Sequence, residues 1–166
     1  RTPEIREVVD FWSDAGALPV SITSSEVLTA YTQGTVDAVD NAAMNLFYMS
    51  ILQNCKYIIP SNHVYSGASW ISNLDWWNNL TEWQRAVISK ACTEAGLLQI
   101  TEMRDWTTKL TTDEGLASMG LPCKVCPVTE VLDSEMKEIS HQLWGKYSDS
   151  YDAEMMEKVF EVFGGM

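Results

Sequence analysis

The stretch from Glu26 to Asn41 most constrains the fold, because it combines a complete helix signal with an extended run. Thr23 and Glu26 have the spacing of a capping box, which starts a helix with its first N–H groups satisfied. Gly34 stands where a helix needs a left-handed residue in order to end. The residues after Gly34 alternate between apolar and polar, which is typical of a short strand, here ending at Asp40-Asn41.

The residues before this stretch predict the same order of helix and strand. Thr2 is a good N-cap and Pro3 a good first residue for a helix whose apolar stripe runs from Ile5 to Ala15. A strand over 17–22, a helix over 25–33 and a strand over 36–41 follow. We therefore expect an α/β fold with helices on a mainly parallel sheet. Such sheets bind small ligands where their strands end, which draws attention to Asp40-Asn41.

The rest of the chain predicts further helices and two short strands. A helix over 42–53, a strand at Tyr57-Ile58-Ile59 and an extended run over 63–73 come first. Thr81 and Gln84 form a second capping box, and the helical pattern after it outlasts about 25 residues, long enough to cross from one lobe to another. A short strand between Gly115 and Val128 and two more helices complete the chain, the last ending at Gly164-Gly165.

Composition excludes several classes of protein. The 166 residues carry a net charge of −12 with only 11 Lys and Arg, so we expect no nucleic-acid partner, since nucleic acids are bound by neutralising phosphates. The sequence contains no apolar run of about 18 residues, so we expect no membrane span. The chain opens on Arg1-Thr2-Pro3 without a signal peptide, which favours a mature or truncated chain.

The four cysteines, Cys55, Cys92, Cys123 and Cys126, do not form a recognisable redox or zinc motif. The pair Cys123-x-x-Cys126 stands between two prolines in an extended segment, whereas a redox pair opens a helix. A zinc site would need a second close pair. Disulfides fit an oxidising compartment, but four cysteines allow three pairings and the sequence leaves all three open.

Several short motifs resemble those of the solute-binding proteins of tripartite ATP-independent periplasmic (TRAP) transporters. They are Arg1-Thr2-Pro3, Ser25-Glu26-Val27, Gly34-x-Val36-Asp37, Asp40-Asn41, Ser61-Asn62-His63-Val64 and Leu80-Thr81-Glu82. Their spacing fits the family without a gap between Arg1 and Asn41. The resemblance covers most of this chain but only the later half of a family member, whose complete chain is about twice as long.

The resemblance implies a periplasmic-binding-protein-like lobe that captures a small organic acid and delivers it to the membrane subunits of a TRAP transporter. Residues 1–73 would form the ligand-binding lobe, 80–114 the long lobe-crossing helix, and 121–166 a strand and C-terminal helices. The protein would be periplasmic, would need no cofactor or metal and would not be an enzyme. A homodimer formed through the long helix is a further expectation.

Arg1 and Asn41 are the first two candidate ligand-binding residues that the resemblance implies. The guanidinium of Arg1 offers paired planar donors that match a carboxylate, and its charge cannot be lost. The side-chain amide of Asn41 can both donate and accept a hydrogen bond. The alternatives are a solvated arginine and a turn or N-cap asparagine.

Ser24, Tyr65 and Trp70 are the remaining ligand-binding candidates. Ser24 stands where many family members carry a phenylalanine, so a hydroxyl or extra space would meet the ligand there. Tyr65 or Trp70 could stack on an apolar part of the ligand. The alternatives are an N-cap role for Ser24 and structural packing for the two aromatic residues.

Some features keep other functions open. Asp40 replaces the usual glutamate of the family, and Val39 its usual glutamine, so the ligand stays unidentified. His63 and His141 belong to no catalytic or metal motif, and His63 matches a family residue with a structural role. An unrecognised α/β enzyme, and a ligand sensor or interaction protein of the same fold, are the two other classes.

Overall fold

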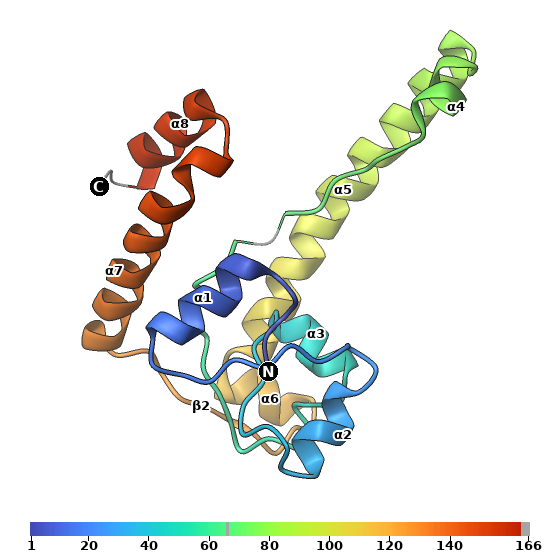
Figure 1. The fold of residues 1–166 in the computed structure, drawn as a ribbon. Helices are drawn as coiled ribbons and strands as arrows, with labels where there is room; N and C mark the ends of the chain where they lie inside the picture. Colours follow the sequence, from blue (N-terminus) through green and yellow to red (C-terminus); the bar gives the residue numbers. More distant parts are fainter. Residues whose placement is uncertain (66, 164–166) are drawn as a thin grey trace.

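The structure is a computed structural model that describes residues 1–65 and 67–163, and helices dominate it. In chain order the elements are α1 (Arg6–Asp14), α2 (Val27–Thr32), α3 (Ala43–Tyr48), β1 (Tyr57–Ile58), α4 (Leu74–Asn78), α5 (Glu82–Leu110), α6 (Asp113–Ser118), β2 (Lys124–Val125), α7 (Glu130–Tyr147), the 3-10 helix η1 (Ser148–Ser150) and α8 (Ala153–Phe163). Figure 1 shows α2, α3 and α6 gathered around one end of α5, with α4 beside the other end. Helix α1 packs on α7, and α8 lies beside α7.

Helix α5 starts where the sequence predicts. The hydroxyl of Thr81 accepts from the backbone N–H of Gln84 at 3.3 Å, and the Gln84 side chain accepts from the backbone N–H of Thr81 at 2.9 Å. This reciprocal pair satisfies N–H groups that have no partner inside the helix. The helix then runs unbroken for 29 residues. Its length is therefore about 44 Å at 1.5 Å per residue.

The larger hydrophobic core lies at the C-terminal end of α5. Its most completely buried side chains are Val27 of α2, Leu52 between α3 and β1, Leu110 of α5 and Leu116 of α6. Ile58 of β1 and Cys123, directly before β2, belong to the same cluster. This core therefore joins elements from both halves of the chain.

A smaller core joins α1 to α7. Phe11 of α1 packs with Met136, Leu143 and Tyr147 of α7. The carboxylate of Asp10 accepts hydrogen bonds from Lys146 and Tyr147 at the edge of this cluster. The first helix is thereby held against the C-terminal part of the chain.

The regular sheet of the described residues is one parallel pair, β1 with β2, in which Tyr57 pairs with Lys124 and Ile58 with Val125. The predicted strand at Tyr57–Ile59 and the one after Gly115 are thus confirmed, and so is their parallel arrangement. The sheet is nevertheless much smaller than the mainly parallel sheet that the sequence predicts, because each strand finds a single partner here.

The predicted strands over 17–22 and 36–41 were wrong as regular strands. Their ends instead flank the first two residues of the chain. Thr2 donates its backbone N–H to Val20 and forms an isolated parallel bridge with Ser21. On the other side Arg1 donates to the carbonyl of Ala38, and Asp40 donates to the carbonyl of Arg1. Because Arg1-Thr2 is so short, each neighbour gains too few hydrogen bonds to form a regular strand.

Two helix boundaries also differ from the prediction. Helix α1 begins at Arg6 rather than at Pro3, because the backbone of Thr2 is already engaged with Val20. Helix α3 ends at Tyr48 rather than near residue 53, and the chain then passes through Ser50 with a positive φ of 58°, which a right-handed helix cannot include. The predicted helix end at Gly164-Gly165 lies outside the described residues.

Among the residues that the structure describes, none of the helices combines the length and the apolar character that crossing a membrane requires.

Replacing Leu110 by alanine should lower the free energy of unfolding of the full-length protein by about 2–5 kcal/mol. The side chain of Leu110 is 0% exposed at the centre of the larger core, so the truncation leaves a cavity. Denaturant unfolding measures the loss. Leu18→Ala is the matched control, because Leu18 is 94% exposed and should change stability by less than about 0.5 kcal/mol. Equal losses in the two variants would contradict this placement of the core.

Candidate functional site

Arg1 lies between two extended segments that come from different parts of the chain. Its main-chain nitrogen donates to the carbonyl of Ala38 at 2.7 Å, and its own carbonyl accepts from the N–H of Asp40 at 2.8 Å. Thr2, which is buried, bonds to the segment on the opposite side. Hydrogen bonds on both sides hold the backbone that carries the guanidinium in one position.

The guanidinium of Arg1 is oriented by main-chain oxygen atoms. Nε donates to the carbonyl of Ile22 at 3.0 Å, and Nη1 lies 3.5 Å from the carbonyl oxygen of Asp40. None of the described residues accepts a hydrogen bond from Nη2. Since a guanidinium carries five N–H donors, several remain for a carboxylate or another planar acceptor.

Asp40 supplies a half-buried negative charge next to Arg1. Its Oδ2 accepts from the indole N–H of Trp12 at 2.9 Å and lies 3.4 Å from Nε2 of His63. Burial acts to raise the pKa of this carboxyl, but the hydrogen bonds from His63 and Trp12, and the nearby charge of Arg1, outweigh it and hold the pKa below its usual value. Asp40 is therefore a carboxylate at neutral pH.

His63 is fixed in an aromatic cage. Its ring stacks on Phe11 with the ring centres 5.0 Å apart and meets Trp12 edge-on at 5.2 Å. Its Nδ1 pairs with the hydroxyl of Ser61 at 2.7 Å. Only 9% of the His63 side chain is exposed, so the ring that contacts Asp40 is largely shielded from water. This agrees with the structural role that the sequence comparison assigns to His63.

Asn41 follows Asp40 directly and lies one residue before Ala42, the N-cap of α3. Its Oδ1 accepts from the backbone N–H of Ala42 and from the side chain of Asn45, both at 2.9 Å. Its Nδ2 lies 3.9 Å from the sulfur of Met49. The amide oxygen is therefore already used within the chain, while the amide nitrogen retains donor capacity toward a ligand.

The other three candidates lie apart from this cluster. Ser24 is exposed in the turn before α2, two residues beyond the carbonyl of Ile22 that Arg1 binds. Tyr65 and Trp70 are 95% and 68% exposed on the segment that leads to α4. The structure thus brings Arg1 and Asn41 together through Asp40, and places Tyr65 and Trp70 on the surface.

Sequence reasoning missed the contacts that Trp12 and His63 make with Asp40. Trp12 was interpreted as part of an apolar helical stripe, and its indole N–H requires a polar partner when the ring is half-buried. That unmet donor, with an acidic residue at a predicted strand end, was the available signal. The pairing joins segments 28 and 23 residues apart, which local patterns do not connect.

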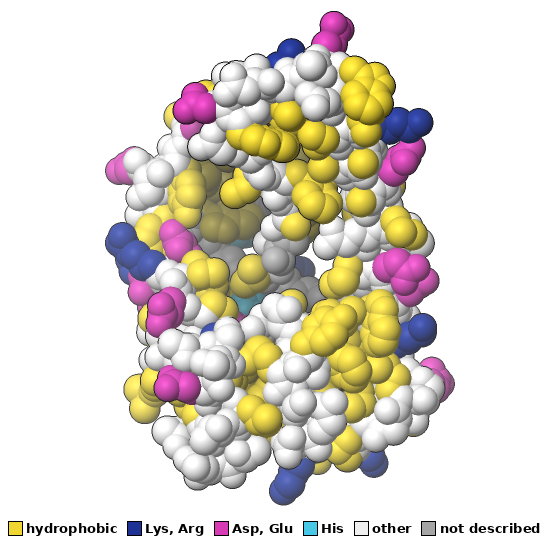
Figure 2. Space-filling model, turned by 90° about the vertical axis from the view of Figure 1, so that its right-hand side faces the viewer, with side chains coloured by type: hydrophobic (Ala, Val, Ile, Leu, Met, Phe, Trp, Pro, Cys, Tyr) yellow, Lys and Arg dark blue, Asp and Glu magenta, His cyan; other side chains and the backbone are white. Residues whose placement is uncertain are grey.

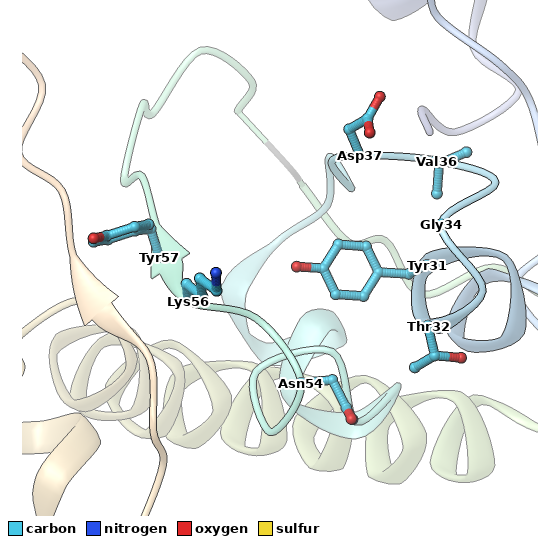
Figure 3. A pocket seen from close by; sticks show the side chains of 8 residues that line it. All are labelled: Tyr31, Thr32, Gly34, Val36, Asp37, Asn54, Lys56 and Tyr57. Atoms are coloured by element: carbon cyan, nitrogen blue, oxygen red, sulfur yellow. The ribbon is translucent and has the colours of Figure 1, made fainter.

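A separate open hollow of about 630 Å³ lies on another face of the segment that carries Asp37. In Figure 3 the side chains of Tyr31 and Lys56 point toward one another across it, whereas the carboxylate of Asp37 points away. Arg1, Asn41 and the aromatic cage of His63 do not line it. Residues 1–65 and 67–163 contain no cluster of three or more His, Cys, Asp or Glu that could hold a metal ion.

Comparison with known proteins gives a consistent result. The family described as "Bacterial extracellular solute-binding protein, family 7" matches residues 1–150. An uncharacterized protein of Haemophilus influenzae is 25% identical over 167 residues, which is 97% of this chain and 48% of the relative. The C4-dicarboxylate-binding periplasmic protein DctP of Rhodobacter capsulatus is 34% identical over 80 residues, or 48% of this chain and 24% of the relative. The chain therefore spans less than half the length of these relatives.

Replacing Trp12 by phenylalanine should destabilise the protein at pH 7 by about 1.5–3 kcal/mol, because the ring stays but a hydrogen bond to the charged Asp40 is lost. The pKa of Asp40 is lowered in the folded state, so its stabilising contribution is present at neutral pH and is lost as the pH falls below about 4. Denaturant unfolding at pH 7 and pH 3 should therefore show a smaller difference between variant and parent at pH 3.

The matched control for this test is Trp106→Phe. Trp106 is also half-buried and packs on Phe47 with ring centres 5.8 Å apart, but it does not bond to a carboxylate. Its cost should be the same at both pH values. A pH-independent loss in Trp12→Phe would contradict the role of the indole N–H in keeping Asp40 ionised.

Proposed function

This chain belongs to the bacterial extracellular solute-binding proteins of family 7, as the TRAP resemblance predicts, and from that premise we propose that it captures a small organic acid outside the cytoplasm. In this proposal the protein is periplasmic and delivers the acid to the membrane subunits of a TRAP transporter. The relative from Rhodobacter capsulatus is named for binding C4-dicarboxylates, which makes dicarboxylic acids the first ligands to test. The proposal assigns no catalysis and no cofactor to the chain.

The observation that carries the proposal is the guanidinium of Arg1, oriented by the main-chain carbonyls of Ile22 and Asp40. A preorganised guanidinium loses less rotational freedom on binding than a mobile surface arginine does. Its remaining donors match the two oxygen atoms of a carboxylate. Asn41, next to Asp40, would add a hydrogen bond from its amide nitrogen, and Ser24, Tyr65 and Trp70 would meet the rest of the ligand.

Asp40 is compatible with this role because one oxygen of its carboxylate is already hydrogen-bonded within the protein. Trp12 and His63 both bond Oδ2, and the contact between Arg1 and Asp40 involves the main-chain oxygen of Asp40. No internal carboxylate therefore occupies the paired N–H donors of the guanidinium.

We further propose that residues 1–73 form the ligand-binding lobe, that 80–114 cross toward a second lobe, and that 121–166 complete the C-terminal part. Helix α5 supports this, because from its first turn to just past its middle it exposes large apolar side chains: Trp83, Val87, Leu97, Leu98 and Ile100. Figure 2 shows apolar side chains gathered on the side of the molecule that carries this part of α5. The rest of a chain twice as long would cover them, and lobe closure around the acid would follow.

A second copy of the chain packing through α5 is the other way to cover this face. The same exposed side chains would suit a dimer interface. We favour the second lobe, because this chain spans 48% of the length of the relative that it matches almost from end to end.

Arg1→Ala in the full-length protein should weaken the binding of a dicarboxylate such as succinate by more than tenfold, measured by titration calorimetry. Losing a charge-assisted pair costs more than the 1.4 kcal/mol that a tenfold change represents. Arg104→Ala is the matched control, since Arg104 is exposed on α5, and its affinity should equal that of the parent. Unchanged affinity in Arg1→Ala would remove Arg1 from the site.

Leu97→Asp tests the covering of α5. Leu97 is 63% exposed here, so by itself the substitution should change the free energy of unfolding by less than about 0.5 kcal/mol. If a second lobe covers it in the full-length protein, a buried unpaired charge should cost more than about 2 kcal/mol. Chemical denaturation of the full-length protein, with Glu94→Ala as the exposed control, distinguishes an exposed Leu97 from one that a second lobe covers. A loss that depends on protein concentration would indicate the dimer instead.

A further inference from the structure

The placement of the four cysteines decides among the pairings that the sequence leaves open. All four are thiols in this structure. Cys123 is buried, Cys55 and Cys92 are half-buried, and Cys126 is exposed. Cys55 and Cys123 belong to the larger hydrophobic core, Cys123 as a member and Cys55 packed against it. Neither takes part in the proposed acid-binding site.

The parallel pairing of β1 and β2 brings these two cysteines together. Cys55 lies two residues before β1, and Cys123 directly precedes β2. Lys124 donates its backbone N–H to the carbonyl of Lys56 at 3.0 Å, so the residues that adjoin the two cysteines are hydrogen-bonded to each other. The register that pairs Tyr57 with Lys124 places Cys123 opposite Lys56, one residue from Cys55, and the two thiols interact with each other.

The same geometry excludes the pairing within Cys123-x-x-Cys126. The two residues between them form β2, so the chain is extended there and the two Cα atoms lie about 10 Å apart at 3.3 Å per residue. A disulfide needs Cα atoms no more than about 7 Å apart. Cys126, moreover, donates its backbone N–H to Ile58, three residues beyond Cys55, which places it at a similar distance from Cys55.

Cys92 is too far away to pair with either core cysteine. It lies on α5, 18 residues before Leu110, and Leu110 is a member of the core cluster that contains Cys123. Eighteen residues of helix correspond to about 27 Å. One pair of cysteines therefore remains within reach of each other.

We propose that Cys55 and Cys123 form a disulfide in an oxidising compartment and thereby join the two segments that lead into β1 and β2. This goes beyond the proposed function and does not depend on the identity of the ligand. The cross-link would close a loop of roughly 70 residues that contains α4, α5 and α6, and loops of this length gain more from closure than short ones.

The reaction is thiol–disulfide exchange with an oxidised dithiol protein or with oxidised glutathione. The thiolate of the more accessible Cys55 attacks the disulfide of the oxidant, which forms a mixed disulfide and releases one thiol. Cys123 then displaces the second thiol and completes the bond. Two protein thiols are oxidised, one disulfide of the oxidant is reduced, and the two protons end on the two released thiols.

The thiol of Cys55 reacts slowly at neutral pH in the folded protein. Burial, and then the neighbouring thiol of Cys123, raise the pKa of Cys55 to about 11, so very little thiolate is present at pH 7. The uncatalysed exchange should accelerate by about tenfold per pH unit between pH 7 and pH 9. Oxidation during folding, before the core closes, avoids this barrier.

The test is to refold the full-length protein in a buffer of oxidised and reduced glutathione, block free thiols with iodoacetamide in denaturant, and map the peptides by mass spectrometry. We expect alkylated Cys92 and Cys126 and a peptide in which Cys55 is linked to Cys123. Reducing this bond should lower Tm by about 5 °C or more. The double variant C92S/C126S should keep both the link and the redox-dependent shift in Tm, whereas Cys55→Ser should lose both.

Alkylation of all four cysteines after oxidation would overturn the proposal. A link that involves Cys92 or Cys126 would overturn it as well. So would a Tm that is the same with and without reductant in the linked protein, because the bond would then not hold the two strand entries together.

Discussion

Three main-chain hydrogen bonds around Arg1 and Thr2 set the geometry on which the candidate site depends. They join Arg1 to Ala38 and Asp40 on one side and Thr2 to Val20 on the other. Buried backbone groups must be bonded, so these contacts fix how the segments at residues 20–22 and 38–40 lie against the start of the chain. The carbonyls that orient the guanidinium come from those same two segments. A constraint on the backbone thus becomes the orientation of a side chain.

The second physical problem in this site is the presence of a carboxylate beside an arginine. An unpaired Asp40 would attract the guanidinium and repel an acidic ligand. The carboxylate of Asp40 is held instead by Trp12 and His63, whose rings are packed against each other and against Phe11. The charge of Asp40 is retained, and Arg1 helps to stabilise it, but no side-chain hydrogen bond joins the two residues. The chain as a whole has a net charge of −12 and repels anions at low salt, so the local positive charge of Arg1 matters for binding an acid.

Patterns that depend on neighbouring residues were predictable from the sequence. The capping box of Thr81 and Gln84 and the start of α5 follow from a spacing of three residues. The strands at 17–22 and 36–41 failed because a strand exists only with partners, and their one partner here is the short Arg1-Thr2 segment. The family, and with it Arg1 as a candidate, came from a resemblance of motifs and not from periodicity.

The contacts of the site were beyond sequence reasoning for the same physical reason. Asp40 meets Trp12 and His63 only after the chain has folded over itself, and nothing local marks an indole N–H as the partner of a distant carboxylate. The cysteines make the same point. The sequence leaves three disulfide pairings open, and the pairing of β1 with β2 brings Cys55 close to Cys123. Where partners are distant in sequence, topology rather than composition decides the chemistry.

The length of α5 has a mechanical consequence. One end is anchored by Leu110 in the core, and the other extends about 44 Å away along a single unbroken helix. The helix therefore acts as a lever: a tilt of about 5° at its base carries its tip through about 4 Å. Small repacking around α3 and α6 is magnified roughly in proportion to that length. A change of side-chain packing near the core that tilted α5 would therefore move its far end by several ångströms.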